Sequence, residues 1–311
     1  MKNLMIPALA LFLSAAAQAD DSPLWMRYCA ISPDGQTIAF SYQGDIYTVP
    51  SSGGKARQLT THPAHDTRPV WSPDGQKIAF ASNRSGNFDV FLMNKEGGEP
   101  KRLTTHSTNE YPTTFKDNGH VLYLANVSQD AKDIQFPGTR FMQVYEISTD
   151  GGRPDLYSSL YMENIALSKD GSKLLYNDYK GYEDPWRKHH QSSITRDIWL
   201  CTLGKDRSFQ KVTTFGGEDR NPVWAADGAS FYYLSEEKGS FNIFKKDLAG
   251  NSERQITTHT THPVRFLTSD NSGTLCYSYD GEIYTVKEGQ KPAKVNIQIV
   301  ACLLYTSDAA D

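Results

Sequence analysis

The chain has 311 residues, of which 38% are hydrophobic and 12% aromatic, so it is long and apolar enough to bury a sizeable core. Lys and Arg total 32, Asp and Glu total 36, and the formal net charge is −4. This balance argues against nucleic acid as a partner, because it supplies no basic field, and there is no long tail of like charge.

Residues 1–19 have the pattern of a secretory signal peptide. Lys2 supplies the positive start, an apolar run extends from Leu4 to Ala17, and Ala17-Gln18-Ala19 forms a small-residue cleavage site. The apolar run is shorter than the roughly 20 residues that a membrane-spanning helix needs. We therefore expect cleavage after Ala19 and an exported, periplasmic protein with no membrane span after signal removal.

Residues 67–106 contain the pattern of one four-stranded antiparallel sheet. Ser72-Pro73-Asp74-Gly75 places Pro, Asp and Gly where a tight turn favours them, so the chain doubles back there. The following strands are rich in β-branched and aromatic residues, and Gly97-Gly98 is expected to break the sheet before a polar outer strand. The four expected strands are 68–71, 77–82, 89–93 and 101–104.

This pattern occurs six times between about Leu24 and Ile297. The turn glycines mark the copies: Gly35, Gly75, Gly119, Gly171, Gly228 and Gly273. Four copies also end their fourth strand alike, as LTTH at 59–62 and 103–106, VTTF at 212–215 and ITTH at 256–259. A repeat of roughly 40 to 50 residues with four strands and no helical periodicity is typical of a β-propeller blade.

One such sheet cannot bury both of its apolar faces, so each blade must be covered by its neighbours around a central axis. We therefore expect an all-β protein in which residues 20–297 form a six-bladed β-propeller of four-stranded antiparallel blades. The alternative is that the six copies are part of a larger ring. The tail at 298–311 matches no part of the repeat and is expected to be non-native or truncated.

Two links between second and third strands are longer than a hairpin needs, at 127–141 and 179–196. Long loops on a rigid scaffold often carry binding residues. The second link concentrates acidic, aromatic, basic and histidine side chains. We include four of its residues among the peptide-binding candidates: Trp186, Arg187, His189 and His190.

The four cysteines include no CxxC pair. Cys29, Cys201 and Cys276 are expected within strands, and Cys302 lies in the tail. Because sequence does not establish which cysteines meet, buried free thiols are expected here rather than disulfides or a metal site.

The chain contains no GxSxG, HExxH, P-loop or dinucleotide motif, so we expect no catalytic residue and no cofactor. The carboxylate pairs Glu218-Asp219 and Glu183-Asp184 are adjacent in sequence, and adjacent strand residues point to opposite faces, which favours loop charge over catalysis. His62 with His65, and His259 with His262, have an HxxH spacing. Since these histidines recur with the repeat, we expect no metal site.

The segments that lead into the innermost strands carry the strongest binding candidates. Arg68, Arg220 and Arg265, with Asp66, Asp219 and His262, would surround one mouth of the central channel and could hold a peptide carboxylate or acidic side chains. The alternative is structural: Arg68 would pair with Asp66, and Arg220 with Asp219 or Glu218, to tie blades together.

The run TRPVWSPDGQKIAFASNRSGNFDVF at 67–91, the LTTH endings, DPWRKHH at 184–190 and EDRNPVW at 218–224 together resemble the N-terminal propeller of exported, tricorn-like serine peptidases. SPDG repeats are shared with TolB and other WD-repeat-like propellers and with dipeptidyl-peptidases. The DPWRKHH segment is more discriminating.

This resemblance implies that a second propeller, a PDZ domain and a tail-specific-type catalytic region, with the nucleophilic Ser and its His, lie outside the chain. The chain alone would then be inert, a fragment of a serine peptidase. Its role would be to admit peptide or unfolded polypeptide to the catalytic chamber, or to release products. The alternatives are a TolB-like periplasmic interaction propeller and the propeller of a dipeptidyl-peptidase-type hydrolase.

Overall fold

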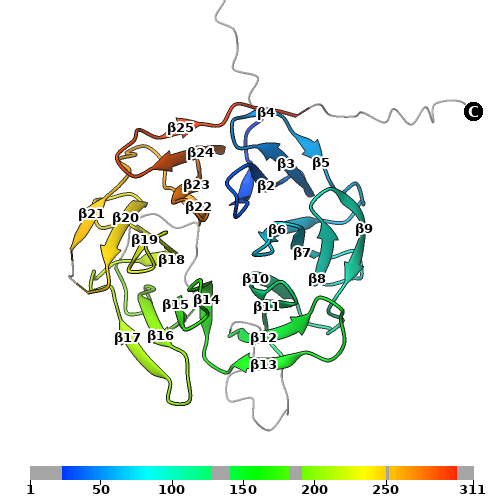
Figure 1. Cartoon of the computed structure of the whole chain (residues 1–311), viewed down its shortest axis with the longest axis horizontal. Helices are drawn as coiled ribbons and strands as arrows, with labels where there is room; N and C mark the ends of the chain where they lie inside the picture. The colour runs from blue at the N-terminus through cyan, green and yellow to red at the C-terminus, as the bar shows by residue number, and fades with distance from the viewer. Residues whose placement is uncertain (1–22, 128–140, 182–190, 250–251, 300–311) are drawn as a thin grey trace, which may run out of the picture.

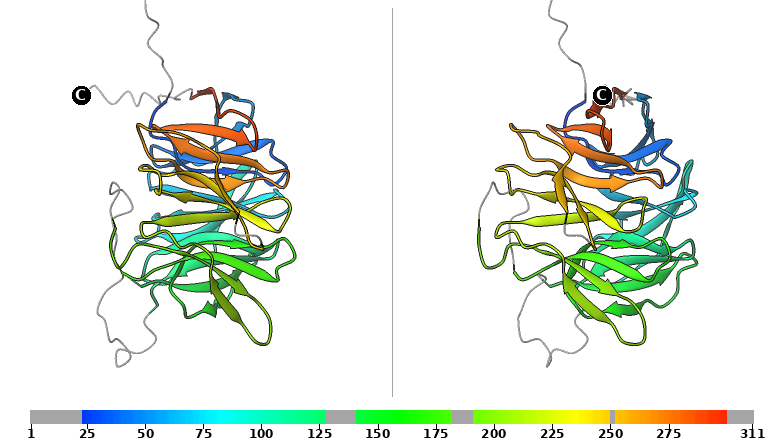
Figure 2. Two further views of the ribbon diagram at one scale, coloured as in Figure 1. Left: turned by 90° about the vertical axis from the view of Figure 1, so that its left-hand side faces the viewer. Right: turned by 60° about the vertical axis from the view of Figure 1, so that its left-hand side comes forward.

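The computed structural model describes residues 23–127, 141–181, 191–249 and 252–299, which form a six-bladed β-propeller (Figure 1). Each blade is a four-stranded antiparallel sheet, and the six blades surround a common axis. Figure 2 shows the ring from its side, with the strands in stacked layers. The described residues contain no helix, and so none that could cross a membrane. The expected all-β architecture is confirmed.

Each blade runs from its innermost to its outermost strand in chain order. Blades 1 to 3 are β1 (Arg27–Ile31), β2 (Thr37–Tyr42), β3 (Asp45–Pro50) and β5 (Arg57–Gln58); β6 (Asp66–Trp71), β7 (Lys77–Ser82), β8 (Asp89–Asn94) and β9 (Gly97–Arg102); and β10 (Glu110–Asp117), β11 (His120–Ala125), β12 (Gln143–Ser148) and β13 (Asp155–Ser158).

Blades 4 to 6 follow the same order. They are β14 (Met162–Leu167), β15 (Lys173–Asp178), β16 (Ile198–Thr202) and β17 (Ser208–Lys211); β18 (Asp219–Trp224), β19 (Ser230–Ser235), β20 (Asn242–Asp247) and β21 (Glu253–Gln255); and β22 (Arg265–Ser269), β23 (Thr274–Tyr279), β24 (Glu282–Lys287) and β25 (Ala293–Lys294).

The SPDG turn is closed by its own side chains. In blade 2, Ser72 Oγ donates to Asp74 Oδ1 at 2.6 Å, and the same Asp74 oxygen accepts from Gln76 N at 3.0 Å. Gly75 has a φ of +66°, a conformation that favours glycine. The repeated motif therefore fixes the hairpin between the first two strands of the blade.

The outer strand of blade 2 differs from the expectation. Gly97 and Gly98 do not break the sheet: they begin β9, which pairs with β8 from Asn94 opposite Gly97 to Phe91 opposite Arg102. The break is the two-residue turn at 95–96. Both glycines have positive φ, which a solvated edge strand tolerates because no neighbouring sheet constrains its outer side.

The apolar core is divided among the seams between blades. Six buried clusters occur, and each combines side chains from two adjacent sheets. Between blades 1 and 2, for example, Ala39 and Ile46 pack against Ile78, Phe80 and Phe91. Each sheet is thus covered on both faces by its neighbours, as a stacked repeat requires.

Two tryptophans of the innermost strands add hydrogen bonds across seams. Trp71 Nε1 donates to the Ala30 carbonyl of blade 1 at 2.9 Å, and Trp224 Nε1 donates to the Ala166 carbonyl of blade 4, also at 2.9 Å. The repeated Trp therefore supplies apolar area to its blade and one polar contact to the preceding blade.

The seam between blades 6 and 1 is closed by a short parallel strand pair at the rim. β26 (Ile297–Gln298) pairs with β4 (Gly54–Lys55), and Gly54 N and Ala56 N donate to the carbonyls of Asn296 and Gln298, both at 2.8 Å. The last blade is thus not completed by a strand from the first. Residues 300–311 lie outside the described ranges.

The described cysteines are free and buried, as expected: Cys29, Cys201 and Cys276. Cys302 lies outside the described residues.

A buried pair of carboxyl groups lies between blades 2 and 3. Asp89 is fully buried and forms an ion pair with Arg102 at 2.8 Å, while Glu110 is 1% exposed at the start of β10. Burial raises the pKa of Glu110 to about 7, and the nearby Asp89 charge also raises it. Near neutral pH, Glu110 therefore retains a proton that it can donate to Asp89.

Replacing Trp224 with Phe should lower the free energy of unfolding by about 1–2 kcal/mol, because the half-buried Ala166 carbonyl loses its indole donor and the seam loses part of an aromatic side chain. Urea denaturation measures this change. Trp25→Phe is the control, since Trp25 is 70% exposed and its replacement should leave stability unchanged. Equal stability of Trp224→Phe and the wild type would contradict the role assigned to this bond.

Glu110 should make stability depend on pH. Its pKa is about 7 in the folded protein against an ordinary value of 4.5, so folding takes up a proton between these pH values. The stabilising contribution is complete below about pH 4.5 and is lost as pH rises through 7. Glu110→Gln should therefore flatten the fall in unfolding free energy between pH 5 and 8, measured by urea titration at each pH. An unchanged pH slope would refute this assignment.

Candidate functional site

The six innermost strands begin at one face of the ring, because strands alternate in direction within each antiparallel blade. The segments that precede these strands, and the turns between second and third strands, therefore share that face, which we call the loop face. Six of the predicted peptide-binding residues lie in or next to these segments: Asp66, Arg68, Asp219, Arg220, His262 and Arg265.

Every innermost strand has a register shift near the loop face. In five blades, one non-glycine residue in this bulge has a φ between 48° and 56°: Tyr28, Arg68, Asn164, Asn221 and Phe266. Asn tolerates this left-handed conformation, whereas Tyr, Arg and Phe rarely adopt it. Tertiary contacts must therefore hold the bulky members of this set in place.

Arg68 stacks on aromatic rings from both neighbouring blades. Its guanidinium carbon lies 4.1 Å from the ring centre of Tyr111 in blade 3 and 5.4 Å from that of Tyr28 in blade 1. Tyr28 also packs against Phe266 of blade 6, with ring centroids 4.4 Å apart. These contacts connect four consecutive blades around the axis.

Asp66 pairs with Arg84, so the alternative that Arg68 pairs with Asp66 is wrong. Asp66 is fully buried, and its Oδ2 lies 2.8 Å from Arg84 Nη2 in the turn after β7. The bulge between Thr67 and Val70 breaks the regular alternation of side chains that would have placed residues 66 and 68 on one face. Within the described ranges, Arg68 has aromatic contacts and no ion pair.

Arg220 belongs to a buried ionic network between blades 4 and 5. Glu218 Oε1 lies 3.3 Å from Arg220 Nη1 and 3.2 Å from Arg196 Nη1, and Arg196 Nε lies 2.8 Å from Glu163 Oε2. The Arg220 guanidinium carbon is also 4.1 Å from the ring centre of Phe241. Of the two partners that the sequence offered Arg220, the structure selects Glu218, and the network ties two blades together.

Asp219 is 1% exposed and lies beside this network. Burial raises the pKa of Asp219 to about 7, although hydrogen bonds with Ser235 and Thr213 act in the opposite direction. Glu218 pairs with Arg196 and Arg220, whereas the buried Asp219 carboxyl binds its proton more tightly than usual. Like Asp66, Asp219 lies below the surface of the loop face.

Asn221 forms a clamp between blades 5 and 6. Its side-chain Nδ2 donates to the Leu267 carbonyl at 2.9 Å, and its Oδ1 accepts from Leu267 N at 3.0 Å. Asn177 Oδ1 accepts from Asn221 N at 2.9 Å and from Asn164 Nδ2 at 3.4 Å. The bulges of blades 4, 5 and 6 are therefore joined by amide groups, whereas those of blades 6, 1 and 2 meet through aromatic contacts.

The other predicted residues are more dispersed. Arg265 is half-buried at the start of β22, and exposed His262 lies 3.2 Å from Asp280 Oδ1 through its Nε2. Arg68 and Arg220 belong to blades 2 and 5, on opposite sides of the ring (Figure 1). Four candidates lie outside the described residues: Trp186, Arg187, His189 and His190.

Tyr28, Tyr111 and Arg84 were not among the residues predicted from the sequence. A signal for the first was present: Tyr28, Arg68, Asn164, Asn221 and Phe266 each stand four residues before the first residue of their blade's SPDG-type turn. Aligning the repeats on that turn would have shown that these five residues occupy equivalent positions around the axis. The ring contacts of Arg84 and Tyr111 have no equivalent signal, since they depend on packing between blades.

Two of the HxxH histidines, His62 and His259, have structural contacts. His62 Nδ1 accepts from Ala64 N at 3.0 Å, and His259 stacks on Tyr279 with ring centroids 3.8 Å apart. Burial lowers the pKa of His259. Over the described part of the chain, no group of three or more His, Cys, Asp or Glu residues is placed to hold a metal ion.

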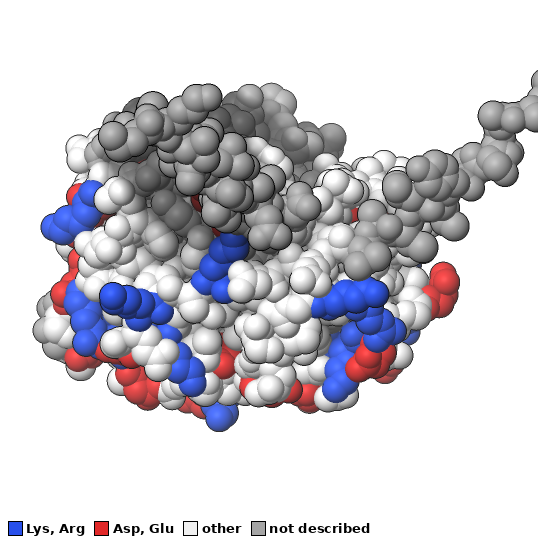
Figure 3. All heavy atoms as spheres, turned by 90° about the horizontal axis from the view of Figure 1, so that it is seen from above, with Lys and Arg blue, Asp and Glu red and all other residues white. Residues whose placement is uncertain are grey.

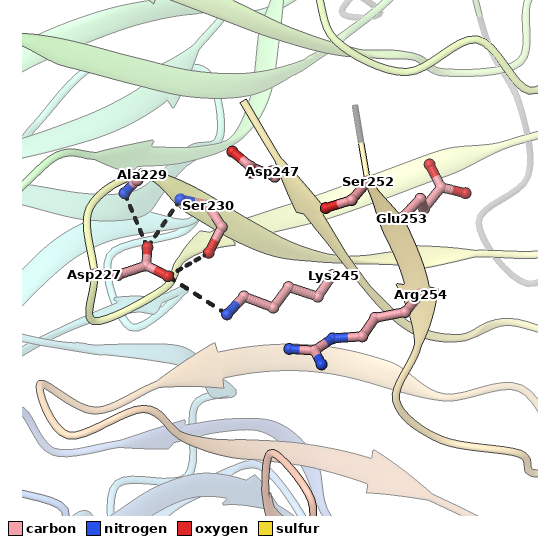
Figure 4. Close-up of a pocket in the computed structure, with 8 residues that line it drawn as sticks. All are labelled: Asp227, Ala229, Ser230, Lys245, Asp247, Ser252, Glu253 and Arg254. Carbon is pink, nitrogen blue, oxygen red and sulfur yellow. Dashed lines mark hydrogen bonds and ion pairs between the residues drawn. The ribbon is translucent and has the colours of Figure 1, made fainter. Parts of the chain in front are cut away.

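A polar pocket of about 450 Å³ lies at the opposite face of blade 5 (Figure 4). Lys245 Nζ lies 3.4 Å from Asp227 Oδ2 and 3.0 Å from Glu288 Oε2 of blade 6. Hydrogen bonds from Ser230 and from the Ala229 amide lower the pKa of Asp227 to about 2, against the raising effect of burial. Lys245, Asp227 and Glu288 are therefore paired with one another, and their charges are not directed at a ligand.

Figure 3 shows the rim of the ring, with basic and acidic side chains interspersed over its described surface. On the described surface seen in this view, this distribution agrees with the balanced composition.

Two tricorn relatives match most of the chain. A tricorn protease homologue of Saccharolobus solfataricus is 23% identical over 271 residues, covering 83% of this chain and 23% of that protein. Tricorn protease homologue 1 of Streptomyces coelicolor is 25% identical over 284 residues, covering 89% of this chain and 25% of that protein. The chain thus spans about a quarter of the length of these relatives.

The crystal structure of the tricorn protease has the same fold over 88% of this chain and 26% of its own, with a TM-score of 0.71 and 22% identity. The family described as the tricorn protease N-terminal beta propeller domain matches residues 23–292, which is most of the sequence. The chain therefore belongs to the family of tricorn protease N-terminal β-propeller domains.

Proposed function

We propose that this propeller binds unfolded peptide at its loop face and gates the passage of substrate or product in a longer tricorn-like serine peptidase. The proposal is supported by the family and by the match to about a quarter of each relative. The nucleophilic Ser and its His, the second propeller and the PDZ domain would belong to the rest of that protein, and this chain would contribute binding without catalysis.

Arg68 is the observation that carries the proposal. Stacking on Tyr111 and Tyr28 uses the flat face of the guanidinium, while its N–H donors point outward in the plane of the group. A half-buried guanidinium with no ion pair in the described ranges is suited to bidentate binding of a carboxylate. The C-terminal carboxylate of a peptide, or an acidic side chain, would supply that group.

Backbone strain supports the same location. Each bulky residue held at positive φ costs on the order of 1–3 kcal/mol, and such strain concentrates at binding sites. Tyr28, Arg68 and Phe266 adopt this conformation and contact one another in sequence around the axis. The arrangement would present a peptide with two aromatic surfaces and one cation in fixed positions.

The three predicted arginines would then have different roles. Arg220 is engaged by Glu218 and Phe241, so we assign it to the scaffold. Arg265 directly precedes Phe266, and His262 is exposed. Arg265 and His262 therefore remain part of the proposed peptide surface. Because Arg68 lies near the start of an innermost strand, a peptide bound there would extend over the axis.

Replacing Arg68 with Met should weaken binding of a peptide that has a free C-terminal carboxylate by about tenfold or more, the equivalent of one lost charge-assisted hydrogen bond. A fluorescein-labelled apolar hexapeptide, in free-acid and C-terminally amidated forms, can be titrated with residues 20–311 by fluorescence anisotropy. The amidated peptide should bind more weakly to the wild type and should be insensitive to Arg68→Met.

Arg57→Met is the matched control, because Arg57 is an exposed rim arginine paired with Glu96 at 2.8 Å. It should bind both peptides as the wild type does. Equal affinity of the wild type for the acid and amide forms, or full binding by Arg68→Met, would exclude Arg68 as the carboxylate site.

We also propose that the protein is exported to the periplasm. The support is the signal-like pattern of residues 1–19, with its small-residue site at Ala17-Gln18-Ala19. Expression with the native N-terminus in a bacterial host should give a periplasmic protein whose first residue by N-terminal sequencing is Asp20. Ala19→Leu should block processing, and cytoplasmic protein that retains residues 1–19 would refute export.

A further inference from the structure

The seam between blades 6 and 1 lacks the direct chain connection that joins consecutive blades. At the other five seams, the chain itself passes from one blade to the next, whereas this seam joins the first blade to the last. At the rim it is held by β4 and β26, and at the loop face by Met26 N donating to the Gly281 carbonyl at 3.0 Å.

Two cysteines meet at this seam. Cys29 of β1 is 1% exposed and Cys276 of β23 is fully buried, and both belong to the apolar cluster that fills the seam. Thr268 lies opposite Cys276 in the β22–β23 register, and its hydroxyl accepts from Ile31 N of β1 at 3.2 Å. β1 is therefore fixed directly beside the strand pair that carries Cys276.

The side-chain contacts place the sulfur atoms of Cys29 and Cys276 in the same part of the seam. Ser278 Oγ donates to Cys29 Sγ at 3.5 Å, and Ser278 is two residues from Cys276 on β23, hence on the same face of the sheet. Burial raises the pKa of the Cys276 thiol, and its contact with the Cys29 thiol raises it further. Cys201 lies in the separate cluster between blades 3 and 4.

We propose that Cys29 and Cys276 form a cross-linking site, at which a disulfide joins the first blade to the last and closes the ring covalently. Cys29 follows Tyr28, and its Sγ donates to the Phe266 carbonyl at 3.3 Å, so the site borders the proposed peptide surface. It would need the oxidising surroundings in which structural disulfides persist, or an added disulfide oxidant in vitro.

The reaction is thiol–disulfide exchange with an oxidised carrier that contains a disulfide. One cysteine thiolate attacks the carrier disulfide, which forms a mixed disulfide and releases one carrier thiolate. The second cysteine thiolate then attacks the protein sulfur of that mixed disulfide, which forms the Cys29–Cys276 bond and releases the second carrier thiolate. The two thiol protons leave to solvent or carrier, and the two electrons reduce the carrier.

The burial of Cys29 and Cys276 limits the conditions under which the disulfide can form. Both thiols are shielded from solvent and Cys276 resists ionisation, so exchange requires folding from the open chain or transient opening of the seam. Once formed, the bond would be shielded from reductants in the same way. Because it would close a loop that includes nearly the whole ring, it should restrict the unfolded chain strongly.

The test is to unfold residues 20–311, refold them in a buffer of oxidised and reduced glutathione, and compare them with protein refolded in excess reductant. After alkylation of free thiols, digestion and mass spectrometry should identify a peptide pair that joins Cys29 to Cys276 in the oxidised sample. The midpoint of thermal unfolding should be higher in the oxidised sample by about 5 °C or more.

Cys29→Ser and Cys276→Ser should each abolish both the linked peptide and the thermal difference, while Cys201→Ser should retain both. The comparison of oxidised with reduced wild type remains decisive even if a variant folds poorly. Complete alkylation of Cys29 and Cys276 after oxidative refolding, or linkage through other cysteines, would overturn the proposal.

Discussion

Face-to-face packing of neighbouring sheets is the interaction on which this structure depends. Among the described residues, six apolar clusters fill the six seams, and each of these clusters is built from two adjacent blades. Stability of any one sheet is therefore inseparable from the sheets on both sides. The same constraint requires the last blade to meet the first, although the chain itself does not connect them there.

Several polar side chains in these seams form hydrogen bonds or ion pairs between neighbouring blades. The Trp71 and Trp224 indoles donate to carbonyls of the preceding blade, and Glu218 sits between two arginines at the seam of blades 4 and 5. A carboxyl group that cannot obtain a cation in this environment holds a proton instead, as burial does for Glu110 and Asp219.

The bulges in the innermost strands create the candidate binding surface at the loop face. They break the alternation of side chains and place one residue per blade in a ring near the axis, in a conformation that Tyr28, Arg68 and Phe266 adopt only under tertiary constraint. The contrast between Arg68, stacked on tyrosines, and Arg220, bound to Glu218, follows from this local geometry. Arg68 occupies the bulge position that Asn221 holds in blade 5, whereas Arg220 stands one residue earlier, so the two arginines differ in place as well as in partner.

The sequence by itself determined the number of blades, the four strands of each and the loop face, because the period, the SPDG turn and strand alternation are properties of neighbouring residues. It did not determine that Arg84 rather than Arg68 would pair with Asp66, that β9 would begin at Gly97, or that β26 would pair with β4. Those outcomes depend on contacts between distant segments. Only the tertiary structure decided them, because packing between blades determines which of several possible partners each residue contacts.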